Sequence, residues 1–284
     1  MENKQKMTVG IVHPGAMGIS LAATMQNSGY TVCWASDGRS AQSQERANEH
    51  GLQDVGTMAE LCLQADFIVS VCPPHAAKDV AAEIIGHRFK GVFLDANAIS
   101  PQKAQEIGQM MAHADIPFVD GSIIGGPAWQ PNRTWLYLSG AKAEAVQAYF
   151  AGGPLETAVI GDEIGHASAL KMCFAAYTKG TSALLAMILA GTEAMGVREA
   201  LTTQWSRNGS DFAEQTEQRV QRVTAKAWRF EGEMHEIAAT FAQVDLPDGF
   251  HLAAAEIYRR MAQFKDAPTL PELETVLRQV QGGD

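Results

Sequence analysis

The residues best suited to chemistry lie in a short loop near the amino terminus, between a strand pattern and a helix pattern. Apolar residues from Val9 to Val12 predict a buried strand, and the spacing of apolar residues over 19–27 predicts a helix. Phosphate groups bind at such helix starts, where backbone N–H groups and the positive end of the helix dipole meet them. We therefore expect a dinucleotide-binding loop made of His13, Pro14, Gly15, Ala16, Met17 and Gly18.

This loop departs from the usual G-x-G-x-x-G pattern at its first position. Gly15 would let the backbone approach a pyrophosphate, and Gly18 would let the helix pack close to the strand. The first glycine, however, is replaced by His13, and Pro14 biases that histidine toward an extended conformation. An ordinary strand-to-helix turn is the alternative interpretation.

The end of the second predicted strand, 31–35, bears on the choice of cofactor. The position that usually carries the acidic residue for the ribose of NAD is Ser36. Arg39 and Ser40 follow, and a cation with a hydroxyl suits a 2′-phosphate. The sequence thus favours NADP, while NAD stays possible because Asp37 could turn inward.

Strand and helix patterns alternate over the first half of the chain. Strands are expected at 67–72, 91–95, 118–119, 135–139 and 157–160, and helices at 40–50, 76–85, from Ser100-Pro101, and at 141–150. After Gly161 only helical patterns remain. We expect an α/β fold, a Rossmann-type doubly wound parallel sheet over residues 1–161, followed by an all-helical domain over 162–284. Ligand-binding loops are expected after the strands, at 72–75 (with Cys72 and Pro73), 95–99 and 120–127.

Composition excludes some classes of partner. The chain has 284 residues, 46% of them hydrophobic and 19% charged, and a net charge of −10. The negative charge argues against nucleic acid and requires that an anionic substrate be held by locally placed cations. Four scattered cysteines indicate reduced core residues, and hence a cytoplasmic protein.

Neither export nor membrane insertion is expected. Residues 1–6 form a polar lead with no apolar core. The apolar region 167–195 is interrupted by Lys171, Lys179 and Glu193, which makes it a poor membrane span and a good buried helix. Because it is too apolar for one small domain to cover, we expect a homodimer.

Four segments occur in the order typical of one superfamily. They are the loop 10–18; Asp95-Ala96-Asn97-Ala98-Ile99-Ser100-Pro101; Asp120-Gly121-Ser122-Ile123-Ile124-Gly125-Gly126-Pro127; and Gly165-His166-Ala167-Ser168-Ala169-Leu170-Lys171. On these segments the chain resembles the β-hydroxyacid dehydrogenase superfamily, which includes 3-hydroxyisobutyrate, tartronate-semialdehyde and 6-phosphogluconate dehydrogenases. The later residues around Trp228-Arg229-Phe230 resemble an uncharacterised helical domain often attached to such cofactor domains.

The resemblance implies that Lys171 is the catalytic acid or base. A lysine facing a closed cleft loses hydration, which disfavours its charged form. A lysine that reaches solvent from the helix end is the alternative. The resemblance also assigns carboxylate binding to the substrate segment, where Ser122, Gly125 and Gly126 would act, although Gly-Gly-Pro can be a simple turn. Asn97 would contact the nicotinamide ribose or the substrate.

The helix after Lys171 departs from the superfamily. Ala175 replaces an amide side chain that usually helps to hold the substrate. Thr178 and Ser182 return to nearly the same face and could replace it in part, or could bond back to their own helix. Lys179 is expected at solvent or at a partner chain, and Glu233 and Glu236 at a solvated or dimer-facing edge. No metal site is expected.

The sequence thus predicts an NADP-preferring oxidoreductase that transfers hydride between nicotinamide and a small hydroxy acid. Two alternatives remain open. One is an imine reductase, which usually has another proton donor in place of the lysine. The other is a cofactor-binding protein without turnover, suggested by His13 and Ala175. Trp129 and Trp135 could shape the substrate pocket, although tryptophan more often belongs to the core.

Overall fold

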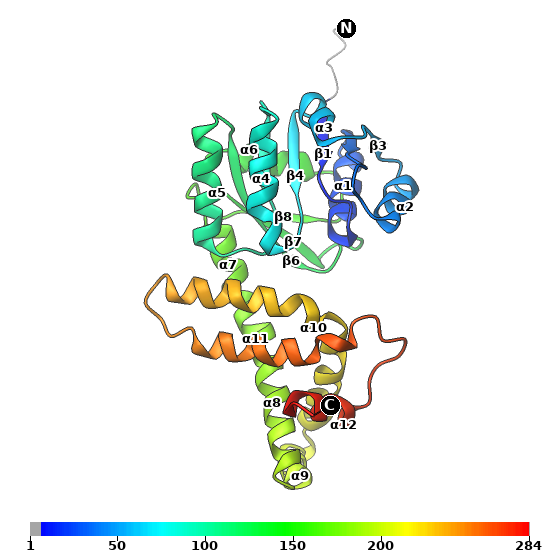
Figure 1. The fold of residues 1–284 in the computed structure, drawn as a ribbon, viewed down its shortest axis with the longest axis vertical. Helices are drawn as coiled ribbons and strands as arrows, with labels where there is room; N and C mark the ends of the chain where they lie inside the picture. The colour runs from blue at the N-terminus through cyan, green and yellow to red at the C-terminus, as the bar shows by residue number, and fades with distance from the viewer. Residues whose placement is uncertain (1–6, 284) are drawn as a thin grey trace. The chain divides into compact units, whose positions relative to one another are not determined.

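The computed structural model describes residues 7–283, which form an eight-stranded α/β sheet followed by helices (Figure 1). The sheet order is β3-β2-β1-β4-β5-β6-β7-β8. β1 to β6 are parallel, β7 is antiparallel to β6, and β8 is parallel to β7. The first six strands have the order of a Rossmann fold, which confirms the predicted fold class. The bounds of β1 to β8, in chain order, are Thr8–Ile11, Thr31–Trp34, Gln53–Asp54, Phe67–Ser70, Val92–Asp95, Phe118–Gly125, Thr134–Ser139 and Glu156–Val159.

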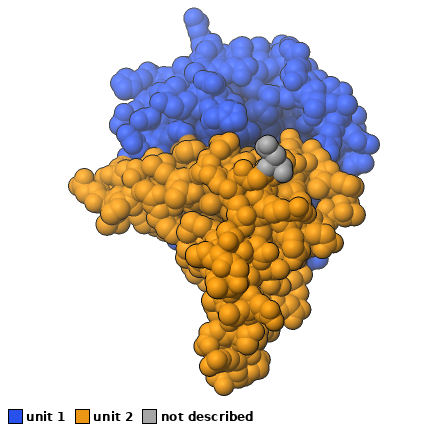
Figure 2. All heavy atoms as spheres, turned by 60° about the horizontal axis from the view of Figure 1, so that its bottom comes forward, with its two compact units in different colours: residues 1–171 blue, residues 172–284 orange. Residues whose placement is uncertain are grey.

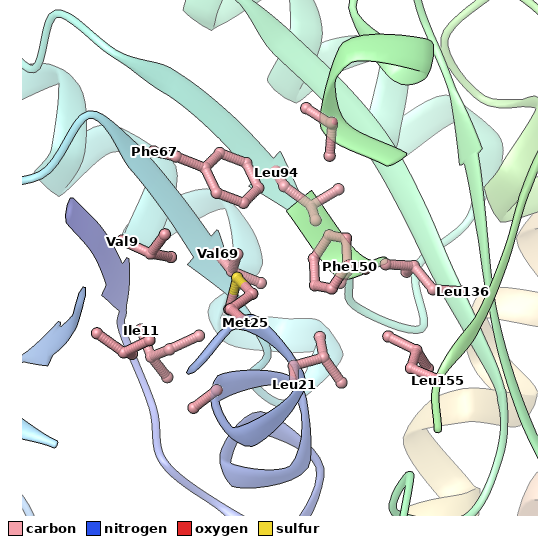
Figure 3. Close-up of a cluster of buried hydrophobic side chains, with 14 of the residues drawn as sticks. Val9, Ile11, Leu21, Met25, Phe67, Val69, Leu94, Leu136, Phe150 and Leu155 are labelled. Atoms are coloured by element: carbon pink, nitrogen blue, oxygen red, sulfur yellow. The ribbon is translucent and has the colours of Figure 1, made fainter. Parts of the chain in front are cut away.

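Two apolar clusters cover the two faces of this sheet, because side chains alternate along each strand. Phe67 and Val69 belong to the first cluster, whereas Ile68 between them belongs to the second. Helices α1 (Ala16–Asn27), α2 (Ala41–Glu49) and α6 (Ala143–Gln147) contribute to the first cluster, part of which Figure 3 shows. Helices α3 (Met58–Gln64), α4 (Ala77–Gly86) and α5 (Pro101–His113) contribute to the second.

Three parts of the sheet region differ from the sequence-based expectations. β3 was not predicted because it has only two residues and both are exposed. The short helix α3 was not predicted either. The segment 120–127 was expected to be a loop, but β6 continues to Gly125. It does so because β7 pairs with it antiparallel over residues 120–125, which turns the predicted substrate loop into the last part of a strand.

The chain divides into two compact units, the first ending at Lys171 and the second beginning at Met172 (Figure 2). The sequence placed this limit ten residues earlier, where the strand patterns end. Helix α7 (His166–Ala175) therefore begins in the first unit and ends in the second. In the second unit follow α8 (Thr181–Ala194), α9 (Arg198–Trp205), α10 (Phe212–Ala242), α11 (Gly249–Met261) and α12 (Leu273–Gln281).

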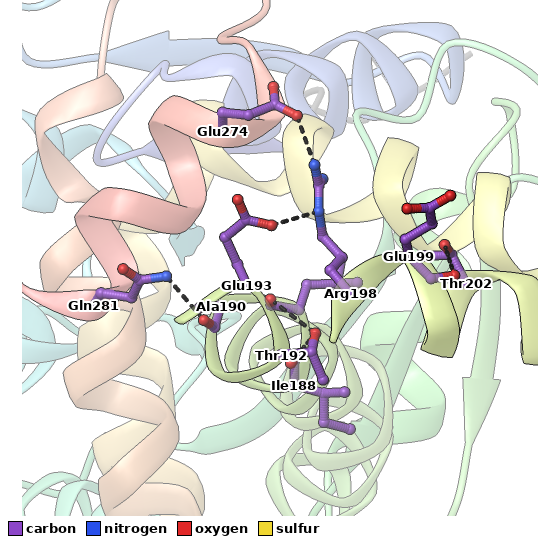
Figure 4. A network of polar contacts seen from close by, with 10 residues as sticks. Ile188, Ala190, Thr192, Glu193, Arg198, Glu199, Thr202, Glu274 and Gln281 are labelled. Carbon is purple, nitrogen blue, oxygen red and sulfur yellow. Dashed lines mark hydrogen bonds and ion pairs between the residues drawn. The ribbon is translucent and has the colours of Figure 1, made fainter. Parts of the chain in front are cut away.

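Polar contacts hold three helices of the second unit together (Figure 4). Arg198, at the start of α9, contacts Glu193 of α8 at 2.7 Å and Glu274 of α12 at 2.9 Å. Gln281 of α12 donates to the carbonyl of Ala190 in α8 at 2.8 Å. One arginine thus joins the end of α8 to the start of α12.

The long apolar helix expected over 167–195 is present as one helical stretch, His166–Ala194, which contains a π turn. Residues Ala176–Gly180 form one π turn between α7 and α8. The whole stretch His166–Ala194 is long and apolar enough to cross a membrane by length and composition alone, a test that the core helix of a soluble protein also passes. That it is a core helix stays a prediction.

The four cysteines are free thiols in different surroundings. Cys33 and Cys62 are buried, Cys72 is half-buried and Cys173 on α7 is exposed. Burial raises the pKa of Cys33 to about 11 and the pKa of Cys72 to about 12, so these thiols stay protonated.

Candidate functional site

In the loop between β1 and α1 the helix begins close to the end of the preceding strand. A Cβ atom on Gly18 would lie 2.1 Å from the carbonyl oxygen of His13, so only glycine allows the helix to start this close to the strand. A Cβ on Gly15 would meet nothing within 4 Å. Gly15 also leaves α1 without a side-chain cap. The first N–H groups of α1, at Ala16 and Met17, therefore have no cap that a phosphate would have to displace.

His13 and Arg39 form a pair beside this loop. Arg39 Nη1 lies 2.6 Å from His13 Nε2. Because a guanidinium can only donate, Nε2 must accept and the histidine proton must sit on Nδ1. Burial, with help from the Arg39 charge, lowers the pKa of His13 to about 4, which keeps the ring neutral. His13 Nδ1 and Arg39 Nε are buried and have no hydrogen-bond partner in the described part of the chain.

The other predicted cofactor residues lie after the neighbouring strands. Ser36 is half-buried behind β2, and Asp37 next to it is exposed. The Ser40 hydroxyl caps α2 by accepting from the Ser43 N–H. After β4, Pro73 is exposed and Cys72 is half-buried. Sheet order reverses between β1 and β4, the place where open α/β sheets bind ligands.

Asn97 is engaged within the sheet edge. Its Oδ1 accepts from the Cys72 N–H, and its Nδ2 donates to Asp95 Oδ2 at 2.8 Å and to Ser70 Oγ at 3.4 Å. The side chain is 2% exposed. Burial raises the pKa of Asp95 to about 7, against the effect of the bonds from Asn97. Asn97 thus ties the ends of β4 and β5 together, and its contact with a ligand stays a prediction.

A buried carboxylate holds the start of α7. Asp120 Oδ2 accepts from the N–H groups of Gly165 and Ser168, at 2.9 and 3.1 Å, and from Ser139 Oγ at 3.0 Å. Its Oδ1 accepts from Ser168 Oγ at 2.7 Å. Burial raises the pKa of Asp120, while these four bonds oppose the rise. The carboxylate fixes the helix that carries Lys171 to strand β6.

Lys171 lies against the predicted substrate segment. Its Nζ donates to the carbonyl of Ile123 at 2.8 Å. Ser122, the preceding residue of β6, is fully buried, and its Oγ has no partner among the described residues. Gly125 and Gly126 are exposed at the end of the strand. Gly125 has φ +125°, and a Cβ there would lie 2.3 Å from the Arg133 carbonyl oxygen. The structure therefore places Lys171 against the segment that was predicted to bind the substrate.

The residues after Lys171 do not show an open polar face. Thr178 Oγ1 donates back to the carbonyls of Phe174 and Ala175, and Ser182 Oγ to that of Thr178, as the second sequence interpretation expected. The π turn also changes the angular spacing on which the shared face was predicted. Ala175 is fully buried.

Two glutamates of α10 were expected at a solvated or dimer-facing edge, but they are buried within the single chain. Glu233 and Glu236 are 7% and 8% exposed. Lys179, expected at solvent or a partner, pairs with Glu233 at 2.9 Å and lies 4.8 Å from the Phe230 ring centre. Within residues 7–283 no group of three or more His, Cys, Asp or Glu side chains could hold a metal ion.

Comparison with known proteins agrees with this geometry. Residues 8–150 match the model of the NAD-binding domain of 6-phosphogluconate dehydrogenase. The chain belongs to this family. Residues 193–261 match a second model, a domain of unknown function. The family membership assigns NAD(P) binding to the first unit, and the uncapped α1 with the unpartnered His13 and Arg39 atoms fits a dinucleotide there.

The proteins that this chain resembles include some of unknown function. An uncharacterised 28.5 kDa protein of Methanothermus fervidus is 29% identical over 185 residues, 64% of this chain and 70% of that protein. A solved conserved protein of unknown function, described as similar to 3-hydroxyacid dehydrogenases, is 26% identical with a TM-score of 0.67, covering 90% of this chain and 98% of its own. Mycobacterium tuberculosis 3-hydroxyisobutyrate dehydrogenase with L-serine shares the fold, with 16% identity, a TM-score of 0.70 and coverage of 98% and 100%.

Sequence reasoning missed the roles of Asp120 and Asp95. Asp95 lies opposite Asp120 in neighbouring strands, and both carboxylates are buried and hydrogen-bonded. A signal was present, since each aspartate directly follows an apolar strand pattern. Trp129, proposed for the pocket, stacks on His50 with ring centres 5.2 Å apart, and Trp135 is half-buried in β7.

Proposed function

We propose that the protein is an NADP-preferring oxidoreductase that interconverts a small hydroxy acid and its oxo acid, with Lys171 as general acid and base. The observation that carries this proposal is the position of Lys171 Nζ, which lies 2.8 Å from the carbonyl of Ile123. Ile123 directly follows Ser122, whose hydroxyl has no partner among the described residues.

Each of these groups has a defined task in the proposal. Bound nicotinamide accepts or supplies the hydride. Lys171 donates a proton to the carbonyl oxygen during reduction, or takes the hydroxyl proton during oxidation. Its ammonium also stabilises negative charge on that oxygen. Ser122 Oγ and the N–H groups of Gly125 and Gly126 offer hydrogen bonds to the substrate carboxylate. Asp120 holds α7 so that Lys171 keeps its place.

The preference for NADP rests on Arg39. The neutral His13 ring accepts from Arg39 Nη1 and so holds the guanidinium beside the dinucleotide loop. Arg39 Nε is left without a partner among the described residues. A 2′-phosphate provides the acceptor that this buried donor lacks. Asp37, the residue that would favour NAD, is exposed.

A protein that binds the cofactor without turnover is the second candidate. It is favoured by Ala175, which is fully buried where the superfamily has a substrate-holding amide, and by Thr178, whose hydroxyl is bonded back to its own helix. Imine reduction is a third outcome that the same assay detects.

The test is a substrate panel with both cofactors, run on the wild type, Lys171→Met and Lys142→Met. The panel contains hydroxy acids, their oxo partners and cyclic imines. Methionine keeps the unbranched stem, so folding and NADPH affinity should be retained while turnover falls roughly 10²- to 10⁴-fold. Exposed Lys142 serves as the matched control, with unchanged turnover. Normal turnover in folded Lys171→Met would refute the assigned role, and no turnover with any substrate would favour the second candidate.

We further propose a cytoplasmic homodimer that binds neither nucleic acid nor membrane. Large apolar side chains stand exposed along the helix from 166 to 194, namely Leu170, Phe174, Tyr177, Leu184 and Met187. Tyr177 is 71% and Met187 47% exposed. A second copy of the chain would cover them. The net charge of −10 and the free cysteines support the absence of nucleic acid and the compartment.

A further inference from the structure

A basic pocket lies between two helices of the second unit. It is lined by Ser182 of α8 and by one face of α10 between residues 215 and 230. Arg219, Arg222 and Lys226 are three and four residues apart, so they project from the same face. No carboxylate is among the lining residues. A protein with a net charge of −10 thus carries a locally positive site.

Four cations of the second unit are paired with carboxylates, whereas these three, like Arg207 and Arg229 of the same unit, form no ion pair among the described residues. Lys179, Arg198, Arg259 and Arg260 each contact a glutamate. Within residues 7–283, Arg219, Arg222 and Lys226 make no ion pair. Arg222 bonds to a neutral amide, Gln218 Oε1, at 3.1 Å. Three like charges held together without counter-charges repel each other, and a bound anion would relieve that repulsion.

Arg219 is held in place by neutral groups. Its Nε donates to Ser182 Oγ and its Nη2 to the Thr178 carbonyl, both at 2.7 Å. Ser182 is itself fixed, because its hydroxyl donates to the Thr178 carbonyl at 3.0 Å. The guanidinium is therefore ordered before a ligand arrives, and its Nη1 hydrogens remain for an oxyanion. A preordered donor lowers the entropy cost of binding.

The pocket also has an apolar part and a definite size. Phe230 and Val223 line it beside the cations, and Phe230 is supported by the Tyr258 ring, whose centre lies 5.3 Å away. The cavity measures about 530 Å³, which suits a small organic molecule. We propose that this pocket binds a small organic anion with at least two carboxylate or phosphate groups. This site does not depend on the proposed hydride transfer.

The test is calorimetric titration of the full-length protein with citrate and with inorganic pyrophosphate at an ionic strength of about 25 mM, where charge interactions are weakly screened. Arg222→Gln combined with Lys226→Gln removes two charges and keeps polar side chains. Arg229→Gln is the matched control, since Arg229 is exposed on the same helix and does not line the pocket. Arg39→Ala reports on binding at the dinucleotide loop.

We expect at least one probe to bind to the wild type. Its affinity should fall about tenfold or more in the double variant and should stay within about twofold of the wild-type value in Arg229→Gln and Arg39→Ala. Tighter binding of citrate would assign the pocket to carboxylates, and tighter binding of pyrophosphate to phosphates. The proposal is overturned if neither probe binds at millimolar concentration, if the double variant binds as tightly as the wild type, or if either control loses as much affinity as the double variant. Loss of a dimer in the double variant, without anion binding to the wild type, would also overturn it and assign the pocket to a subunit contact.

Discussion

At the scale of single residues, the position of Lys171 depends on a carboxylate 51 positions earlier in the chain. Asp120 accepts four hydrogen bonds and is 1% exposed. It replaces the side-chain cap that a serine or threonine usually provides at a helix start. Lys171 lies one turn beyond the capped residues, so a loose helix start would move its ammonium.

Asp120→Ala should lower the free energy of unfolding by about 3 kcal/mol, because the buried N–H groups of Gly165 and Ser168 lose their acceptor. Asp120→Asn keeps an acceptor oxygen and should cost about 1 kcal/mol. Denaturant unfolding measures both. Asp162→Ala, at an exposed site near the same helix, should change stability by less than about 0.5 kcal/mol. Equal stability of the two Asp120 variants would contradict the capping role.

Arg39 and His13 should have graded effects on cofactor affinity. Arg39→Ala should weaken NADPH binding about 10- to 100-fold and leave NADH binding unchanged, because a charged hydrogen bond contributes about 1.5 to 3 kcal/mol. His13→Ala releases the guanidinium and should weaken NADPH binding by a smaller factor. Fluorescence titration of both cofactors measures this. Arg46→Ala, on α2, is the control. If Arg39→Ala leaves the ratio of the two affinities unchanged, the NADP preference is wrong.

At the scale of elements, α1 shows how two glycines of one loop serve different needs. Gly18 is required for packing, whereas Gly15 borders open space. Gly18→Ala should therefore lower the melting temperature, since its Cβ would collide with the His13 carbonyl. Gly15→Ala should leave the melting temperature unchanged and weaken cofactor binding, because its methyl group occupies the space beside the helix start. Thermal melts and cofactor titrations separate the two effects, and the reverse pattern would refute this assignment.

The sequence was informative where a local pattern determines an element. The glycine loop, the alternating strands and the Ser100-Pro101 helix start follow from period, propensity and capping. The sequence was uninformative where the structure of a segment depends on a residue or strand that is distant in the chain. β6 continues through Ser122 only because β7 pairs with it, and Glu233 is buried because Lys179 of another helix neutralises it. The resemblance implied roles for both Lys171 and the predicted substrate segment, whereas the bonds from Asp120 to the start of α7 could be found only from the folded structure.

At the scale of the whole molecule, the exposed apolar helix face predicts the assembly. Phe174→Glu should convert the dimer into a monomer, because a charge would be buried in an apolar contact. Sedimentation at micromolar concentration measures the mass of each species. Leu63→Glu is the control, since Leu63 is 78% exposed in the first unit and lies on α3. A wild-type monomer, or a dimer that persists in Phe174→Glu, would contradict this interface.

The distribution of thiols provides a labelling site for following that assembly. Cys173 is exposed on α7, directly beside Phe174, whereas Cys33 and Cys62 are buried and the Cys72 thiol has its pKa raised to about 12. Maleimide reagents react with thiolates that solvent can reach, so a single fluorophore would attach, and it would attach at Cys173. Its rate of attachment in dilute and in concentrated protein would then report, without any substitution, how much of α7 is covered when two copies meet.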